Sequence, residues 1–294
     1  FAQRGTYVWG HTWAGDAYLI MQWAGLQPEI IFDETIMQRG LEGFKVLVMM
    51  DCDVLIQTVV DRIKAFQAAG GLLVGDDRIC PMIKPDIVLK SRDRVGKADE
   101  DKAALQQIAR DLRERLAGRY PYYALSDNPD VVVYRRRAGA TDYLFAINDR
   151  REFGEYVGHH GLVMENGLPS EATITVDRRK GFAYDLVAGL AVPTRAEKGK
   201  LILHLGLKPC DGRLVMITDR EIAEVQVDCP DQATLGDTVR LHVAVVDGRG
   251  KPIDAVVPVR VDVLDPEGRP AEFSGYYGAA GGQLDVSLDL ATND

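Results

Sequence analysis

The sequence has few cysteines and no long apolar run, and each shortage excludes a class of protein. Four cysteines are scattered along 294 residues without C-x-x-C spacing, namely Cys52, Cys80, Cys210 and Cys229. This pattern offers neither a zinc motif nor a thioredoxin-like motif, and it is too sparse for a disulfide scaffold. The longest apolar runs, such as residues 46–50, have the length of a buried strand, far below the roughly 20 residues that cross a bilayer. We therefore expect no membrane partner.

Clustered basic residues and phosphate-binding loops are also missing. The net charge of −9 argues against a nucleic-acid partner, because phosphate binding needs clustered Lys and Arg. The one basic run, residues 135–137, follows an apolar run and is interpreted as an exposed strand end. Gly5, Gly10 and Gly15 do not form G-x-G-x-x-G, and no G-K-[ST] follows a glycine-rich turn. We expect no nucleotide and no other cofactor.

Residues 16–118 alternate between helix and strand patterns. Residues 29–32 and residues 44–50, which are apolar apart from Lys45, are predicted strands. A helix with Asp53 as its N-cap should follow, because apolar residues recur at three- and four-residue steps from Ile56 to Phe66. A third strand, residues 72–74, and a helix over residues 98–117 complete the pattern. The prediction for residues 1–118 is a small doubly wound α/β domain.

After Gly118 short strand-like runs replace the helical periodicity. Turn residues separate runs at 131–134, 143–147, 173–176, 182–186, 201–205 and 214–217. They predict an antiparallel β-sandwich over residues 119–219. Alternating runs at 238–243, 257–264 and 283–290 predict an immunoglobulin-like or macroglobulin-like domain over residues 220–294. The fold class is therefore α/β plus all-β: a parallel-sheet domain followed by two β-sandwich domains, the last incomplete.

We expect the sequence to be a piece of a longer protein. It begins at Phe1 with neither an initiator Met nor a signal peptide, and it stops at Asp294 where a further strand is expected.

Residues 44–48 and 63–74, a strand and then a helix ending in F-x-x-x-G-G-x-L-V, resemble the trimerisation domain of family-42-type β-galactosidases. That domain is a class I glutamine-amidotransferase-like, flavodoxin-like fold that has lost its catalysis. Residues 184–189 and 212–217 are similar to the β-sandwich that follows such domains in large glycoside hydrolases. The resemblance implies a catalytic barrel before Phe1. The immunoglobulin-like segment favours a periplasmic or secreted location, whereas cysteine usage leaves the compartment open.

The amidotransferase resemblance raises the question of a live nucleophile. In that family a cysteine sits on a strained elbow after the strand that corresponds here to residues 72–74. Here the elbow is Gly75-Asp76-Asp77, so a carboxylate stands in place of the thiolate. Cys52 follows the wrong strand, and no His-x-Glu pair lies at a suitable distance. We predict no catalytic residue.

Four aspartates form the main candidate cluster. Asp51, Asp53, Asp76 and Asp77 should meet at the carboxyl edge of the parallel sheet, where open α/β folds bind ligands. Carboxylates there could hold Ca²⁺ or Mg²⁺, contact a sugar, or act as an acid/base pair in hydrolysis. Alternatively, Asp53 is a helix cap and the others are solvated turn residues or partners of Arg78.

Aromatic residues suggest sugar stacking or an interface. Trp9 and Trp13 precede the first helix, and Tyr276-Tyr277 lies in the last domain, where one ring of the pair should pack inward. His159-His160 is interpreted as a surface loop, since adjacent histidines on a strand would face opposite ways and no third metal ligand is near in sequence.

The predicted function is that of a non-catalytic accessory or oligomerisation region of a multidomain glycoside hydrolase. Its partner would be the protein's own upstream catalytic domain or another copy of the chain, contacted through residues 5–15. The alternatives are a carbohydrate-binding module and a degenerate glutamine-amidotransferase-like enzyme.

Overall fold

The structure is a computed structural model that describes residues 13–153, 157–158, 161–162 and 165–290. The chain divides into two compact units, residues 1–123 and residues 124–294.

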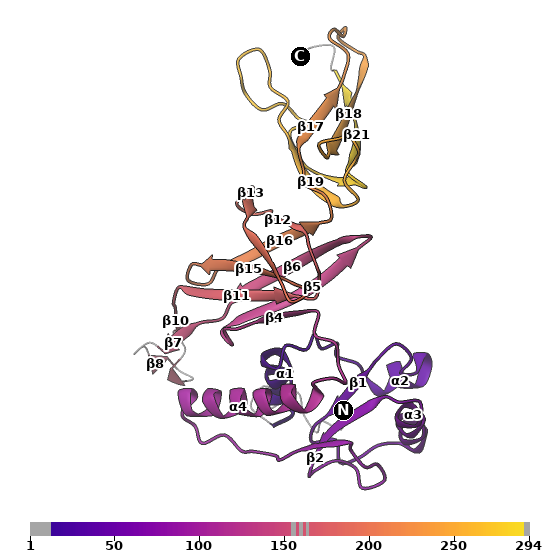
Figure 1. The fold of residues 1–294 in the computed structure, drawn as a ribbon, viewed down its shortest axis with the longest axis vertical. Coiled ribbons are helices and arrows are strands. Elements are labelled where there is room, and N and C mark those ends of the chain that lie inside the picture. Colours follow the sequence, from indigo (N-terminus) through magenta and orange to yellow (C-terminus); the bar gives the residue numbers. More distant parts are fainter. Residues whose placement is uncertain (1–12, 154–156, 159–160, 163–164, 291–294) are drawn as a thin grey trace. The chain divides into compact units, whose positions relative to one another are not determined.

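The first unit is built on a small parallel sheet whose strands follow the order β1-β2-β3 (Figure 1). Register aligns Val46 with Leu72 and Val74 with Ile87. The elements in chain order are α1 (Trp13–Trp23), α2 (Asp33–Arg39), β1 (Val46–Met49), α3 (Gln57–Ala68), β2 (Leu72–Asp76), β3 (Ile87–Leu89) and α4 (Ala98–Leu116).

Both faces of this sheet are covered, which explains why its strands are apolar up to Asp76 at the end of β2. Val46 and Val48 pack with α1 and α4, whereas Leu47 and Met49 pack with α2 and α3. Figure 1 shows the two helix pairs on opposite sides of the sheet. Successive side chains of a strand point to opposite faces, so one continuous apolar run supplies two cores.

Three sequence predictions in this unit are wrong. Trp13 begins α1 rather than preceding the first helix. Residues 29–32 form no strand: Ile30 and Phe32 are 51% and 58% exposed, and β1 is an edge of the sheet. The third helix begins at Gln57 rather than beside Asp53, and Ile56 is its N-cap. The buried stripe of this helix starts only at Val59, because Ile56 is half exposed and takes no part in it.

The second unit begins with two antiparallel sheets packed on a common core. One sheet has the order β14-β15-β11-β4 and the other β13-β12-β16-β6-β5. Their strands are β4 (Ala124–Ser126), β5 (Val131–Ala138), β6 (Thr141–Asn148), β11 (Ser170–Val176), β12 (Phe182–Asp185), β13 (Leu190–Val192), β14 (Thr194–Glu197), β15 (Lys200–Leu207) and β16 (Gly212–Thr218). Alternate residues of both sheets, such as Leu144, Ile174 and Leu203, fill the space between them. Two short pairs lie beside them, β7 (Arg151–Phe153) with β10 (Glu165–Gly167) and β8 (Val157–Gly158) with β9 (Gly161–Leu162).

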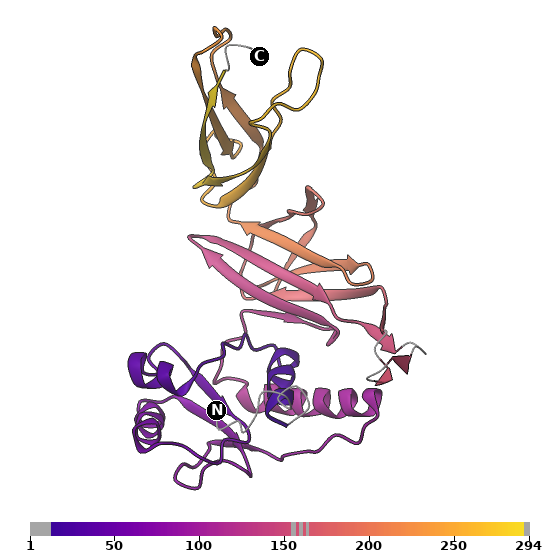
Figure 2. The same cartoon turned by 180° about the vertical axis from the view of Figure 1, so that it is seen from behind.

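A further five-stranded sheet follows with the order β17-β18-β21-β20-β19. Figure 2 shows this part of the chain from behind, in orange to yellow. Its strands are β17 (Glu224–Asp228), β18 (Thr238–Val246), β19 (Val256–Val261), β20 (Gly275–Ala280) and β21 (Gln283–Asp289). β20 and β21 pair only at their shared turn, Ala280 with Gln283, so the sheet curls and β20 contacts β18. The structure confirms the predicted class of α/β plus all-β.

The curled sheet shares a core with the outer face of the sheet that contains β16. Val215 and Ile217 point into the sandwich, whereas Met216 between them packs with Val245 and Ile253. Polar contacts support this core: the Tyr143 hydroxyl accepts a 2.8 Å hydrogen bond from Val256 N–H, and the Thr141 hydroxyl donates one of 2.6 Å to the Asp254 carbonyl. One compact unit therefore results.

Among the helices of the residues placed here, none is both long and apolar enough to span a lipid bilayer.

Candidate functional site

The carboxyl edge of the parallel sheet is organised around the carboxylate of Asp76. This residue ends β2 and is only 2% exposed. Its oxygens accept hydrogen bonds from the Trp13 indole N–H at 2.6 Å, the Asp51 N–H at 2.8 Å and the Arg78 N–H at 3.1 Å. Asp76 therefore joins the start of α1, the end of β1 and the turn after β2. A buried carboxylate needs such donors, and here the protein itself supplies them.

The four predicted aspartates do not converge on one point. Asp51, with a φ of 56°, lies beside Asp76, and its carboxylate is 4.0 Å from the Arg78 guanidinium. Asp77 turns toward the segment after β3 and accepts the Ser91 N–H at 3.0 Å, and hydrogen bonds from Ser91 hold the pKa of Asp77 below its ordinary value. Asp53 is exposed in the segment that leads to α3. Within the placed residues, no group of three His, Cys, Asp or Glu could hold a metal ion.

The position expected for an amidotransferase nucleophile has no reactive thiol. Asp76 is followed by a turn and then β3, without the helix that a nucleophile elbow requires. Cys52 and Cys80 are 2% and 5% exposed and pack in the core under α2 and α3. The Cys52 thiol donates to the Met50 carbonyl at 3.4 Å, and the Cys80 N–H donates to the Cys52 carbonyl at 2.7 Å. Both cysteines are part of the packing.

Two further buried acids, which sequence reasoning missed, hold the segment before α4. Asp16 on α1 is 1% exposed and pairs with Arg94, which raises the pKa of Arg94. Asp101 accepts hydrogen bonds from the N–H groups of Val95 and Gly96, each at 3.0 Å. The bond from Val95 is the main cause that lowers the pKa of Asp101. A signal was present: Asp101 stands four residues before Leu105 on the apolar stripe of its helix, where an acid must find a partner.

The aromatic candidates have different surroundings. Trp13 is 3% exposed and bonded to Asp76, while Trp9 and His159-His160 lie outside the described residues. In β20 the Tyr276 side chain is 79% exposed, and the Tyr277 hydroxyl donates to the Phe273 carbonyl at 2.8 Å. Alternation along the strand therefore leaves Tyr276 available for a ligand.

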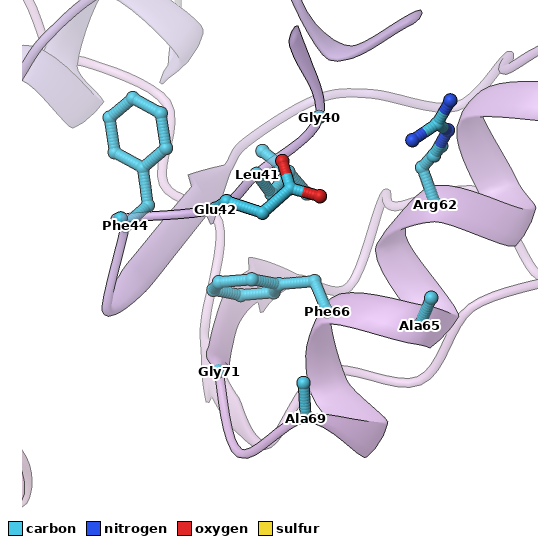
Figure 3. A pocket seen from close by; sticks show the side chains of 10 residues that line it. Gly40, Leu41, Glu42, Phe44, Arg62, Ala65, Phe66, Ala69 and Gly71 are labelled. Atoms are coloured by element: carbon cyan, nitrogen blue, oxygen red, sulfur yellow. The ribbon is translucent and has the colours of Figure 1, made fainter.

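A pocket of about 440 Å³ opens between the loop before β1 and helix α3 (Figure 3). It is lined by Gly40, Leu41, Glu42, Gly43, Phe44, Arg62, Ala65, Phe66, Ala69 and Gly71. Figure 3 shows the Glu42 carboxylate extending toward α3, where Arg62 stands, with the Phe66 ring below it. The volume lies within the roughly 300–1,000 Å³ typical of small-ligand sites. Phe66 and Gly71 belong to the segment that resembles a trimerisation domain, but no sequence signal marked Glu42 and Arg62 as members of one site.

A second concavity, of about 660 Å³, lies in the second unit. Arg150, Lys208 and Arg213 line it together with Glu171, and it has no aromatic lining.

Comparison with known proteins gives structural matches only. No family model and no curated protein matches the chain. Among solved structures, α-L-fucosidase isoenzyme 2 from Paenibacillus thiaminolyticus matches 70% of this chain and 45% of its own, with a TM-score of 0.51 and 10% identity. Gan42B, a GH42 β-galactosidase from G. stearothermophilus, matches 72% of this chain and 36% of its own, with a TM-score of 0.43 and 14% identity. The chain thus spans less than half the length of either protein. It shares its fold with part of the α-L-fucosidase.

Proposed function

We propose that this chain is a non-catalytic accessory region of a multidomain glycoside hydrolase. The observation that carries the proposal is the closed network around Asp76. In open α/β folds ligands bind outside the carboxyl ends of the strands. Here the carboxylate of Asp76 at that edge is buried and already accepts hydrogen bonds from three protein donors. The two thiols of the unit, those of Cys52 and Cys80, are also buried. A nucleophile or acid/base pair must be accessible to substrate, and neither group meets this condition.

The fold supports the setting. An α/β unit followed by antiparallel sheets matches part of the fucosidase, and the resemblance of residues 63–74 to a trimerisation domain adds the expected role of joining subunits. The partner would be the protein's own catalytic domain or another copy of the chain.

Exposed apolar side chains on the first unit suit such a contact. Ile30 and Phe32 lead into α2, and Val54 and Ile56 lead into α3; each is at least 50% exposed. Exposed apolar side chains are available for contact with a second protein surface. The proposed interface therefore includes these four side chains in addition to the predicted residues 5–15. Trp13, which belongs to that predicted segment, is buried in its own unit.

Light scattering on the purified chain, alone and mixed with a separately expressed catalytic barrel of the same protein, tests this role. Replacing Phe32 and Ile56 with Ser should abolish the assembly seen with the unaltered chain. Val187 and Leu190, 68% and 66% exposed in the second unit, provide the matched control when both are replaced with Ser. An unaltered chain that stays monomeric and binds no barrel contradicts the proposal.

A second candidate function is carbohydrate binding through an exposed aromatic side chain. Tyr276 stands on the outward face of β20 opposite Arg260, and a tyrosine ring can stack on a sugar. Retention on an insoluble polysaccharide that is lost on Tyr276→Ala, but kept on Tyr123→Ala, would support this function.

A further inference from the structure

The pocket between α3 and the loop before β1 has the features of a site for a polar, uncharged small molecule. Its lining includes one acid, Glu42, and one base, Arg62, so the charges cancel. Both side chains are exposed, and among the described residues neither forms an ion pair, with the other or with any further charged group. A carboxylate and a guanidinium that are not paired with each other can each form a charge-assisted hydrogen bond with a ligand.

The floor between these two groups is apolar. Phe66 and Ala65 project from α3, Ala69 stands at its C-cap, and Leu41 closes the side of the loop. Phe66 is 8% exposed, so its ring is fixed in the core and only a small part faces the pocket. A few polar groups over an apolar floor is the usual composition of a ligand site.

Two glycines fix this geometry. Gly40 has φ 73° and ψ −162°, a conformation open essentially to glycine alone, and the Glu42 carboxylate occupies the place that a Cβ at Gly40 would take. The Phe66 ring likewise fills the place of a Cβ at Gly71. Since the ring is buried, it cannot swing away, and Gly71 therefore sets the depth of the floor.

We propose that this pocket binds one pyranose unit of a saccharide. Ring hydroxyls can donate to Glu42 and accept from Arg62, and the C–H face of the ring can lie on the apolar floor. The choice of a saccharide rests on the proposed glycoside hydrolase setting. A zwitterionic amino acid would also be uncharged overall, so the experiment must separate the two classes.

NMR titration of the full 294-residue chain with D-galactose, L-fucose, D-glucose and L-rhamnose tests the site. At least one of these sugars should bind and shift the amide signals of Gly43 and Gly71. Glu42→Gln and Arg62→Gln should each weaken its affinity about tenfold or more, because each removes a charge-assisted hydrogen bond. Ala65→Leu should abolish binding, because the larger side chain would occupy the pocket.

Matched controls are available on neighbouring surface. Glu34→Gln on α2 and Lys64→Gln on α3 remove exposed charges outside the lining and should leave the affinity within twofold. Circular dichroism and urea midpoints equal to those of the unaltered chain establish that each variant is folded.

Three outcomes overturn the inference: none of the four sugars binds, binding survives Glu42→Gln and Arg62→Gln, or glycine binds with the same dependence on these residues. None of these outcomes bears on the accessory role, since the light-scattering experiment does not involve this pocket.

Discussion

The indole N–H of Trp13 donates a 2.6 Å hydrogen bond to the buried carboxylate of Asp76, 63 residues away in sequence. This bond ties the first helix to the carboxyl end of β2. It also explains why a tryptophan and an aspartate that looked available for a ligand are instead engaged with each other.

Trp13→Phe should lower the free energy of unfolding of the first unit by about 1–3 kcal/mol, because it leaves Asp76 buried with one donor fewer. Trp23→Phe provides the control for loss of ring volume, since Trp23 is 9% exposed and its indole forms no hydrogen bond with the described residues. Urea unfolding followed by circular dichroism measures both. Equal losses in the two variants would show that the bond to Asp76 contributes nothing.

Alkaline pH should destabilise the first unit through Tyr122. Burial raises the pKa of Tyr122 to about 12, and its hydroxyl donates to the Arg113 carbonyl at 3.2 Å. Because the pKa of Tyr122 is higher in the folded than in the unfolded chain, its protonated hydroxyl stabilises the native state fully at any pH below the unfolded value of about 10. This stabilisation is lost as pH rises from about 10 toward 12. Urea midpoints between pH 8 and pH 11.5 should fall less in Tyr122→Phe than in the unaltered chain. If the urea midpoints of the two proteins fall equally with pH, Tyr122 is not the group responsible.

Met216→Ala should weaken the joint between the sandwich and the curled sheet. Met216 is 1% exposed among residues of both parts, so truncation should cost about 2–4 kcal/mol. Limited proteolysis should then cut residues 219–223 sooner. Met216→Leu keeps the volume and should cost less than about 1.5 kcal/mol. Unchanged cleavage in Met216→Ala would mean that this core does not hold the two parts together.

The curled sheet should be the least protected part of the second unit. All five residues of β17 are exposed, and Val225 and Val227 are 53% and 59% exposed although they share a face with the buried Val243 and Val245. β17 is an edge strand, so one side of its backbone has no partner strand among the described residues. Hydrogen exchange should be fastest in β17 and faster in β17–β21 than in β5, β6 and β16. Uniform protection would contradict this.

Much of the architecture could be predicted because its signals are local. The apolar run before Met50 and the stripe from Val59 to Phe66 identified a parallel strand and its helix, since both periods are set within one element. The alternating runs from residue 131 onward identified β5, β6, β11, β12, β15 and β16 for the same reason.

What the sequence could not supply depends on distant residues. Residues 29–32 have the composition of a strand, but a strand also needs pairing with a neighbour, and these residues do not pair with the open edge of β1. The bond from Trp13 to Asp76 and the packing of Met216 against Val245 join segments that no periodicity connects. The pocket around Glu42 and Arg62 likewise arises from two surface charges brought together by the turn at Gly40.

The central claim is that the carboxyl edge of the sheet is structural and not catalytic. Turnover of a panel of 4-nitrophenyl glycosides, and of glutamine, by the purified 294-residue chain tests it most directly. The account predicts no turnover above the buffer blank for either kind of substrate. Turnover that is abolished by Asp76→Ala or by Cys52→Ala, in variants shown by circular dichroism to be folded, would contradict it.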